Sequence, residues 1–217
     1  MKKFFACVVL LAIFSSVVFY FGWTQFRVKP QQVGIVISKT DGIDETPVTN
    51  GTFSWHKEFL IPTNAELKLF SIKPVNLTKT VKGQLPSGNV YTAVYNSSDN
   101  FDYFLSFSMS LTVSPEALVK LIKENKVTDN DDLSAYLEKS GDVLAQLAAD
   151  YYLKKARENE NFRPESVRRD DLLKAIQFYK DCPEIELSTF ALLESKIPDY
   201  TLYKKMQSAG VEAEVAE

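Results

Sequence analysis

Few side chains in this sequence have the types and spacing that chemistry at a protein site requires. The chain has a single histidine, His56, and two cysteines, of which Cys7 lies in an apolar N-terminal run and Cys182 far along the chain. A zinc site needs about four His, Cys or carboxylate ligands, and a Ser-His or Cys-His catalytic pair would have to be built on His56 alone. An intramolecular disulfide is not expected. The common metalloenzyme and hydrolase chemistries are therefore disfavoured.

Neighbouring carboxylates are the other candidates for chemistry. They occur as Asp131-Asp132 and Asp170-Asp171, with Glu158 and Glu160 two residues apart. Paired acids can hydrolyse glycosides or bind a cation. Adjacent residues on a helix point about 100° apart, however, so neither aspartate doublet can close on one atom. The first doublet lies at an expected helix start, where the helix dipole favours acidic residues.

Three further features have a functional and a plainly structural interpretation. His56 could act as a lone acid-base group, but the surrounding sequence offers no partner, so we expect a surface histidine on a hairpin. Arg168-Arg169 could contact lipid headgroups or an acidic partner, although a solvated helix face pairing with the aspartates that follow is favoured. Cys182 is expected to be a buried or idle thiol, with an intermolecular disulfide as the alternative. Cys7 is expected to be a small apolar residue of a membrane helix.

Motifs for nucleotide, phosphate or metalloprotease chemistry are missing. The sequence contains no P-loop, dinucleotide-binding glycine motif, nucleophile elbow or HExxH motif, and its eight glycines occur singly. The formal net charge of −3 lacks the basic excess that is typical of nucleic-acid binders. We therefore expect no catalytic residues, no cofactor, no metal and no nucleic-acid partner.

The N-terminal segment predicts where the protein resides. The run from Phe4 to Trp23 carries no charge, and as a helix it would be ~30 Å long, which matches the hydrocarbon core of a bilayer. A cleaved signal peptide usually has a shorter apolar core and a small-residue cleavage site, whereas this run ends in bulky side chains. We expect an uncleaved single-pass anchor. The basic residues on its two sides barely discriminate between orientations, but a short basic head before a long tail favours a cytoplasmic N-terminus and an extracytoplasmic domain.

Residues 31–113 have the pattern of β-structure. Apolar residues alternate from Val33 to Ile37, Asn50-Gly51 is a strong turn signal, and further strands are expected on both sides of Pro74. A second turn is expected at 86–89. In 101–113 every odd position is apolar and five of the six even ones are polar, which predicts one buried and one solvent-facing side.

The period then changes to that of helices. Ser114-Pro115-Glu116 predicts a helix start, with a hydroxyl N-cap and proline at the first position. A longer helix is expected from Asp129–Asp132 onward, in which Gly141 is a weak point or a kink. A third is expected after Pro164, with a buried stripe that consists of Leu172, Leu173, Ile176 and Tyr179.

The C-terminal part is expected to return to a strand. Ile185, Leu187, Ala191 and Leu193 alternate, which predicts a late strand with these side chains on one face. Pro198-Asp199 begins a last helical piece, and residues 211–217 are expected to be a disordered tail. The whole order predicts an α+β fold: an antiparallel β-sheet half followed by packed helices and a late strand, preceded by one N-terminal transmembrane helix.

The order of these segments is also characteristic of a family. Residues 28–36 (VKPQQVGIV) match the strand pattern V-x-P-x-x-x-G-V-V, residues 50–55 (NGTFSW) a glycine-containing turn, and Ile61-Pro62 the proline that follows. Residues 107–113 (FSMSLTV) match a strand that leads into a helical half, and 197–203 (IPDYTLY) the end of a domain. Together they resemble the stomatin/prohibitin/flotillin (SPFH, or band-7) superfamily.

The resemblance implies a non-enzymatic membrane scaffold. It implies a membrane anchor at 1–27, an SPFH-like domain at 28–203 and a short acidic tail at 204–217. Such proteins self-associate at the bilayer, organise lipids or regulate membrane proteases and channels. The implied partners are therefore membrane lipid, further SPFH-type chains and a membrane protease or other membrane protein. Family members usually continue into a long coiled coil, whereas about fourteen residues follow Tyr203 here, which favours a smaller oligomer or a longer homologue as partner.

Two other function classes stay open. The first is an anchored envelope hydrolase, which would bring two carboxylates together from distant segments such as Asp131-Asp132 and Asp170-Asp171. The second is an anchored ligand-binding module, whose pocket would be lined by some of the fifteen Phe, ten Tyr and two Trp. Most of these aromatic residues fall at expected core positions, so the scaffold interpretation leads.

Overall fold

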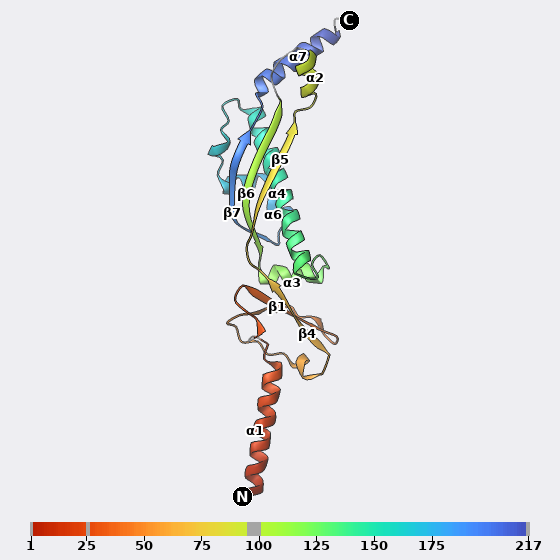
Figure 1. Cartoon of the computed structure of the whole chain (residues 1–217), viewed down its shortest axis with the longest axis vertical. Coiled ribbons are helices and arrows are strands. Elements are labelled where there is room, and N and C mark those ends of the chain that lie inside the picture. The colour runs from red at the N-terminus through yellow and green to blue at the C-terminus, as the bar shows by residue number, and fades with distance from the viewer. Residues whose placement is uncertain (1, 25–26, 95–100, 216–217) are drawn as a thin grey trace. The chain divides into compact units, whose positions relative to one another are not determined.

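The computed structural model describes residues 2–24, 27–94 and 101–215, of which 210–215 are described by backbone alone. Figure 1 shows an N-terminal helix, two β-sheets and a set of further helices. The predicted α+β class is confirmed, but the strands form two sheets instead of one. The chain divides into a first unit, Met1–Lys73 with Thr112–Tyr136, and a second unit, Pro74–Leu111 with Leu137–Glu217.

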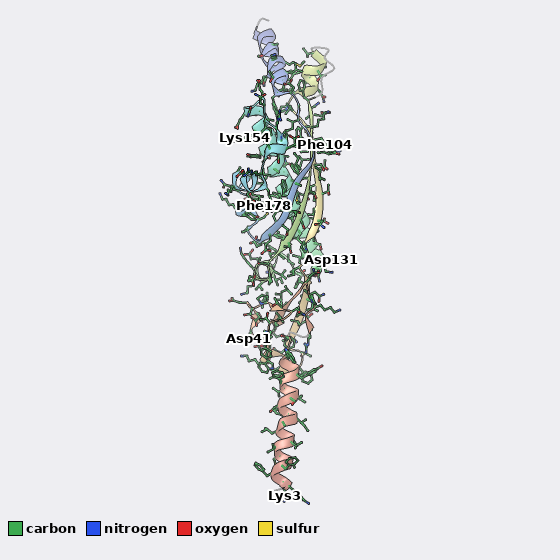
Figure 2. The ribbon with its side chains drawn as sticks, turned by 90° about the vertical axis from the view of Figure 1, so that its left-hand side faces the viewer. Lys3, Asp41, Phe104, Asp131, Lys154 and Phe178 are labelled. Atoms are coloured by element: carbon green, nitrogen blue, oxygen red, sulfur yellow. The ribbon has the colours of Figure 1, made fainter. Side chains whose placement is uncertain are left out.

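The N-terminal helix α1 (Lys2–Gly22) is the apolar run that the sequence indicates. It is long and apolar enough to cross a membrane, and its side chains project outward along most of its length (Figure 2), with only Gly22 at its end buried. A stable water-soluble helix would bury one face, so this helix needs an apolar surrounding. A signal sequence meets the same criteria of length and composition, so the retained anchor stays a prediction.

The first unit contains a four-stranded sheet built around β1 (Gln32–Ser38). β1 pairs antiparallel with three strands, which are β2 (Gly42–Ile43), β3 (Val48–Thr49) and β4 (Ala65–Ser71). The β1–β4 register runs from Gln32 opposite Ser71 to Ser38 opposite Ala65. A small core of Val28, Val36 and Val48 packs under this sheet. The unit also holds the short 3₁₀ helix η2 (Lys57–Leu60) and α3 (Pro115–Lys123).

The second unit contains a longer three-stranded sheet in the order β5-β6-β7. The strands are β5 (Val75–Gln84), β6 (Asp102–Val113) and β7 (Ile185–Lys196), and the β5–β6 pair is antiparallel from Val75 opposite Leu111 to Gln84 opposite Asp102. The long helix α4 (Asn130–Glu158) packs against it at Gly141. A Cβ there would lie 2.7 Å from Leu77 Cδ1 and 3.4 Å from the Met109 sulfur. Gly141 therefore provides close helix–sheet contact, and α4 continues through it.

The prediction that β6 buries its odd-numbered apolar residues is confirmed. The prediction that its even-numbered residues face solvent is wrong in part. Leu105 and the odd residues that follow are buried. Ser106 and Ser110 are buried too, and the hydroxyl of Thr80 on β5 donates to Ser106 Oγ at 3.3 Å. Small hydroxyl side chains that find hydrogen-bond partners can be buried at little cost, so the even face is not uniformly solvent-facing.

The alternation predicted for β7 is correct only at its start. Ile185 is buried, but Leu193, which the sequence placed on the inward face, is 55% exposed. The pattern changes phase at Ser188 and Thr189, both exposed, so that Phe190 turns inward and stacks on Phe107 at 5.4 Å between ring centroids. A change of one residue moves the following side chains to the opposite face of a strand.

The predicted helices after β6 are mostly present. α3 begins where expected: Ser114 caps it by accepting a hydrogen bond from the Ala117 N–H at 3.1 Å. The third predicted helix is instead three pieces, η3 (Pro164–Ser166), α5 (Arg169–Ile176) and α6 (Phe178–Asp181). Gln177 breaks the helix with a left-handed φ of 52°. As a result Phe178 is buried and Tyr179 is exposed, the reverse of the predicted stripe.

Two helices at the other end of the second unit differ from expectation. The turn predicted at 86–89 leads into the short helix α2 (Gly88–Val94), inside a region that the sequence assigned to β-structure. α7 (Tyr200–Val215) extends well into the tail that was expected to be disordered, and 216–217 lie outside the described residues. Asp199 caps α7 by accepting hydrogen bonds from the N–H groups of Thr201 and Leu202.

Candidate functional site

The candidate site among the described residues lies where α1 ends. Reactive polar side chains and exposed aromatic side chains come together there. The backbone of residues 22–24 pairs there with that of 54–56, and Trp23 and Trp55 form an antiparallel bridge. The N–H of His56 donates to the Gly22 oxygen at 2.8 Å, and the N–H of Thr24 donates to the Ser54 oxygen at 3.1 Å. The apolar helix is thus joined to the first unit by strand-like hydrogen bonds as well as by the connecting chain.

Aromatic side chains reinforce this junction. Phe53 stacks on Phe19 of α1 with 6.0 Å between ring centroids, and Trp23 lies 5.5 Å from Phe19 and 6.3 Å from Phe53. The Trp55 indole N–H donates to the backbone oxygen of Phe19 at 3.2 Å. We call these four residues, Phe19, Trp23, Phe53 and Trp55, the helix-end cluster.

Gly22 is the residue that leaves space for the helix-end cluster. A Cβ at this position would overlap the indole ring of Trp55. Any other residue would therefore force Trp55 away from the last turn of α1. In the sequence Gly22 is only an isolated glycine within an apolar run. Its role could not be predicted there, because it depends on a contact with a residue more than thirty positions away.

A polar network lies beside the helix-end cluster and is centred on His56. Its Nε2 is 2.7 Å from Ser54 Oγ, and its Nδ1 is 3.2 Å from Asp44 Oδ2 and 3.9 Å from Glu58 Oε2. The imidazole is only 11% exposed. The predicted surface histidine without a partner is therefore wrong. The alternation of an extended chain places Ser54 and His56 on one side, and the turn after β2 brings Asp44 to them.

The network continues to the end of α1 through Thr24. The Thr24 side chain is fully buried and lies 3.2 Å from the Ser54 backbone oxygen and 3.3 Å from Ser54 Oγ. Serine, imidazole and carboxylate follow one another here in the order of nucleophile, base and orienting group that acyl-transfer enzymes use. A protonated His56 would instead donate to the Asp44 carboxylate as a charge-assisted hydrogen bond.

Sequence reasoning selected His56 but missed its partners. The spacing of Ser54 and His56 in an extended segment could have suggested a shared face. No local pattern pointed to Asp44, since it lies on a separate turn whose position depends on the hydrogen bond from its N–H to the Val36 oxygen on β1, at 2.9 Å.

The carboxylate doublets serve separate structural roles. Asp132 accepts hydrogen bonds from the Thr128 N–H at 3.0 Å and from the Thr128 hydroxyl, and these bonds lower the pKa of its carboxyl group. The Asp132 N–H donates in turn to Asp129 Oδ1 at 2.8 Å. The predicted helix-capping role of this doublet therefore agrees with the structure, and no cation is needed to explain it.

The second doublet lies beside the arginine pair, as the sequence suggests. Arg169 Nε is 3.0 Å from Asp170 Oδ1, and its Nη1 donates to the Ser188 oxygen on β7 at 3.1 Å. Glu158 pairs with Lys155 at 3.2 Å. Asp171 and Glu160 are exposed. Within 2–24, 27–94 and 101–215, no group of three or more His, Cys, Asp or Glu side chains has the arrangement to hold a metal ion.

The two cysteines are free thiols in different surroundings. Cys7 is exposed on α1, and Cys182 is buried after α6, which agrees with the buried thiol predicted for Cys182. In the second unit, aromatic rings gather where α2 and α7 meet: Tyr203 lies 5.7 Å from Tyr91 and 5.4 Å from Phe101, and its hydroxyl donates to the Pro86 oxygen at 2.7 Å. Burial raises the pKa of Tyr203, which is consistent with a packing role.

The chain was compared with known proteins and with protein-family models. No protein-family model matches the chain. The sequence is 25% identical over 200 residues to an uncharacterized protein of Treponema pallidum (strain Nichols), an alignment that covers 90% of this chain and 67% of the relative. The similarity extends along most of the chain but carries no function with it. The SPFH resemblance therefore stays a prediction.

Proposed function

We propose that this protein is a membrane-anchored scaffold or assembly protein of the SPFH type. It self-associates or joins homologues, and in this way organises the membrane or regulates membrane proteins such as proteases. The observation that carries the proposal is the hydrogen-bonded junction of residues 22–24 with 54–56, because it couples an apolar helix rigidly to a folded unit. A helix that only targets a chain for export needs no such coupling. The N-terminus is cytoplasmic and the folded units are extracytoplasmic in this proposal.

The second unit supplies a surface that suits self-association. In the order β5-β6-β7 the outer strands β5 and β7 are the edges of the sheet, and edge strands readily pair with a further chain. β7 is twelve residues long and is mostly exposed, including Leu193. A long exposed edge strand is normally shielded in a monomer, so lateral contact between copies is the favoured explanation.

The mass of the protein in mild detergent tests this proposal. We expect a discrete oligomer from the full chain by light scattering, and a smaller species from a chain that begins at Thr24. Leu193→Lys should reduce the mass because it places a charge on the edge strand. Lys174→Glu, at an exposed position on α5, is the matched control and should leave the mass unchanged. A monomer in every case would remove self-assembly as the mechanism.

A second candidate function is favoured by the geometry of Ser54, His56 and Asp44. Ser54 Oγ could attack an ester carbonyl while His56 Nε2 takes its proton, and Asp44 would hold the imidazole through Nδ1. The alcohol would leave with the proton from His56, and water would then release the acyl group from Ser54. Asp132 and Asp170 each have local partners of their own, so this hydroxyl nucleophile is the better form of the hydrolase alternative.

Covalent labelling separates the two candidates. A fluorophosphonate reacts with an activated serine, so a hydrolase would gain the mass of the probe on Ser54, and Ser54→Ala would abolish the gain. Ser208→Ala, at an exposed position on α7, should change nothing. If the full chain gains no mass under conditions that label a known serine hydrolase, Ser54 is not activated and the network is structural.

A further inference from the structure

We infer that the loop 53–61 is a second membrane-inserting element, which enters the lipid interface beside the end of α1. This inference rests on the anchoring part of the proposed function, that α1 spans a bilayer, and not on self-association. The loop carries four large apolar side chains at its surface: Phe53 is 61% exposed and Ile61 57% exposed, with Trp55 and Leu60 somewhat less so. Exposed apolar side chains that gather in one short segment mark an interaction surface.

The position of the loop follows from its contacts with α1. Phe19 lies four residues before Trp23, about 6 Å down the helix axis. Because α1 is about as long as the hydrocarbon core is thick, Trp23 falls at the boundary and Phe19 falls inside it. The Phe53 ring stacks directly on Phe19. A ring in that contact must lie at the depth of Phe19, so Phe53 enters the acyl region when α1 spans.

The remaining residues of the loop suit the interface itself. The Trp55 indole reaches the Phe19 backbone oxygen, and tryptophan is enriched where apolar and headgroup regions meet. The 3₁₀ helix η2, which ends in Leu60, also contacts α1. Lys57 is exposed within η2, and Arg27 lies 5.2 Å over the Phe59 ring. Cations beside apolar anchors fit the phosphate layer above the acyl chains.

Lipid is therefore the occupant that the contacts favour over a protein partner. The loop contacts a helix whose own exposed surface requires lipid, through the Phe53 ring on Phe19 and the Trp55 hydrogen bond to the Phe19 oxygen. One consequence is that the His56 network lies at the level of the headgroups. The first unit is then held to the membrane at two points and has a defined orientation on it.

The two tryptophans of the chain permit a direct test. Trp23→Phe leaves Trp55 as the only indole, and the full-length variant is placed in phosphatidylcholine vesicles that carry bromine near the ester end or near the methyl end of the acyl chain. We expect a blue-shifted emission from Trp55 and stronger quenching by bromine near the ester end. Aqueous iodide should quench it weakly. Emission at the wavelength of water-exposed indole, quenched by iodide and not by bromine, would overturn the inference.

The reciprocal variant distinguishes failure of the inference from failure of the anchor. Trp55→Phe leaves Trp23, which reports whether α1 itself enters the bilayer. Bromine quenching of Trp23 without quenching of Trp55 rejects the loop insertion and keeps the anchor, whereas no quenching of either rejects both. Phe53→Ser with Trp23→Phe should shift the Trp55 emission to the red, because the loop loses its deepest anchor. Ser87→Ala, on a turn of the second unit, should leave the emission unchanged.

Discussion

The two units of this protein are stabilised in different ways. The second unit has strands of ten and twelve residues, and its core includes the odd-numbered side chains of β6 from Leu105 onward, which recur with period two. The first unit has strands of two to seven residues, and its buried apolar side chains include Ile35 and Phe70 from these short strands and Leu118 from α3. Specific contacts add to this burial, such as the pairing of 22–24 with 54–56 and the bonds around His56. Long strands build the second unit, whereas short strands joined by particular pairs of residues build the first.

The difference has a consequence for function. Short strands leave polar groups that must find side-chain or turn partners, and this gathers Thr24, Ser54 and His56 into one network. The same irregularity leaves Phe53 and Ile61 exposed on a loop. Candidate chemistry and candidate lipid contact therefore lie in the unit with the less regular backbone, as is common for binding and catalytic loops.

The largest expected effect is the loss of a core side chain from the second unit. Phe107 is fully buried between Phe190 and Tyr152. Phe107→Ala should reduce the free energy of unfolding by about 3–5 kcal/mol, through lost burial and the cavity that remains. Hydrogen exchange read by mass spectrometry should show faster exchange in β6 and β7. Lys174→Ala, at an exposed position on α5, is the control and should have almost no effect on exchange. Equal effects from both would contradict the core assignment.

A smaller effect is expected from His56 in the first unit. His56→Ala leaves the Ser54 and Asp44 side chains without their shared partner and should cost about 1–3 kcal/mol. Since Asp44 acts through His56, the double variant with Asp44→Ala should cost less than the sum of the two single changes. Faster hydrogen exchange should be confined to residues around 42–58. Strict additivity would show that the two residues are energetically independent.

The pH dependence of stability offers a further test of the comparison between the two units, because the second unit buries Tyr152. Burial, and to a lesser degree the nearby Tyr151 and Glu165, raises the pKa of Tyr152 from 10.0 to about 12. Because the folded-state pKa lies above the unfolded value, this tyrosine contributes full stability below about pH 10 and loses it as the pH rises toward 12. The urea midpoint of the second unit should fall across that range. Tyr152→Phe should reduce the fall, whereas Tyr179→Phe, at an exposed site, should leave it unchanged.

The smallest effect is expected from a helix cap in the first unit. Ser114→Ala removes the side-chain acceptor for the Ala117 N–H and should cost about 1 kcal/mol. Ser114→Asp retains an acceptor and should restore most of the stability. A calorimetric scan of the full chain in mild detergent compares the three proteins. Failure of the aspartate to restore stability would mean that Ser114 acts through packing and not through the cap.

Local patterns predicted many elements of the fold because their causes are local. The period-two run of β6, the cap of α3 and the start of α4 depend on residues a few positions apart. The failures have distant or conformational causes. Gln177 adopts a left-handed conformation although it is not a glycine, and the phase change at Ser188 accompanies the stacking of Phe190 on Phe107. Periodicity alone could not place either of them.

The candidate site was less predictable than the fold. His56 was visible as the only histidine, and the apolar length of α1 was visible as a membrane signal. The partners of His56 were not visible in the sequence, because Asp44 lies twelve positions before His56 on another turn. The aromatic residues Phe53 and Trp55 were assigned to a turn, and their contact with Phe19 had no sequence signature.

The amino-acid sequence by itself determined the apolar helix, the α+β order of elements and the period-two burial of the odd-numbered residues of β6. These properties follow from side-chain type and spacing within single elements. Tertiary structure alone decided that residues 22–24 pair with 54–56, that Gly22 leaves space for Trp55 and that His56 lies between Ser54 and Asp44. The physical reason is range: a hydrogen bond or a ring contact acts over a few ångströms, and only the folded chain brings residues from distant positions that close.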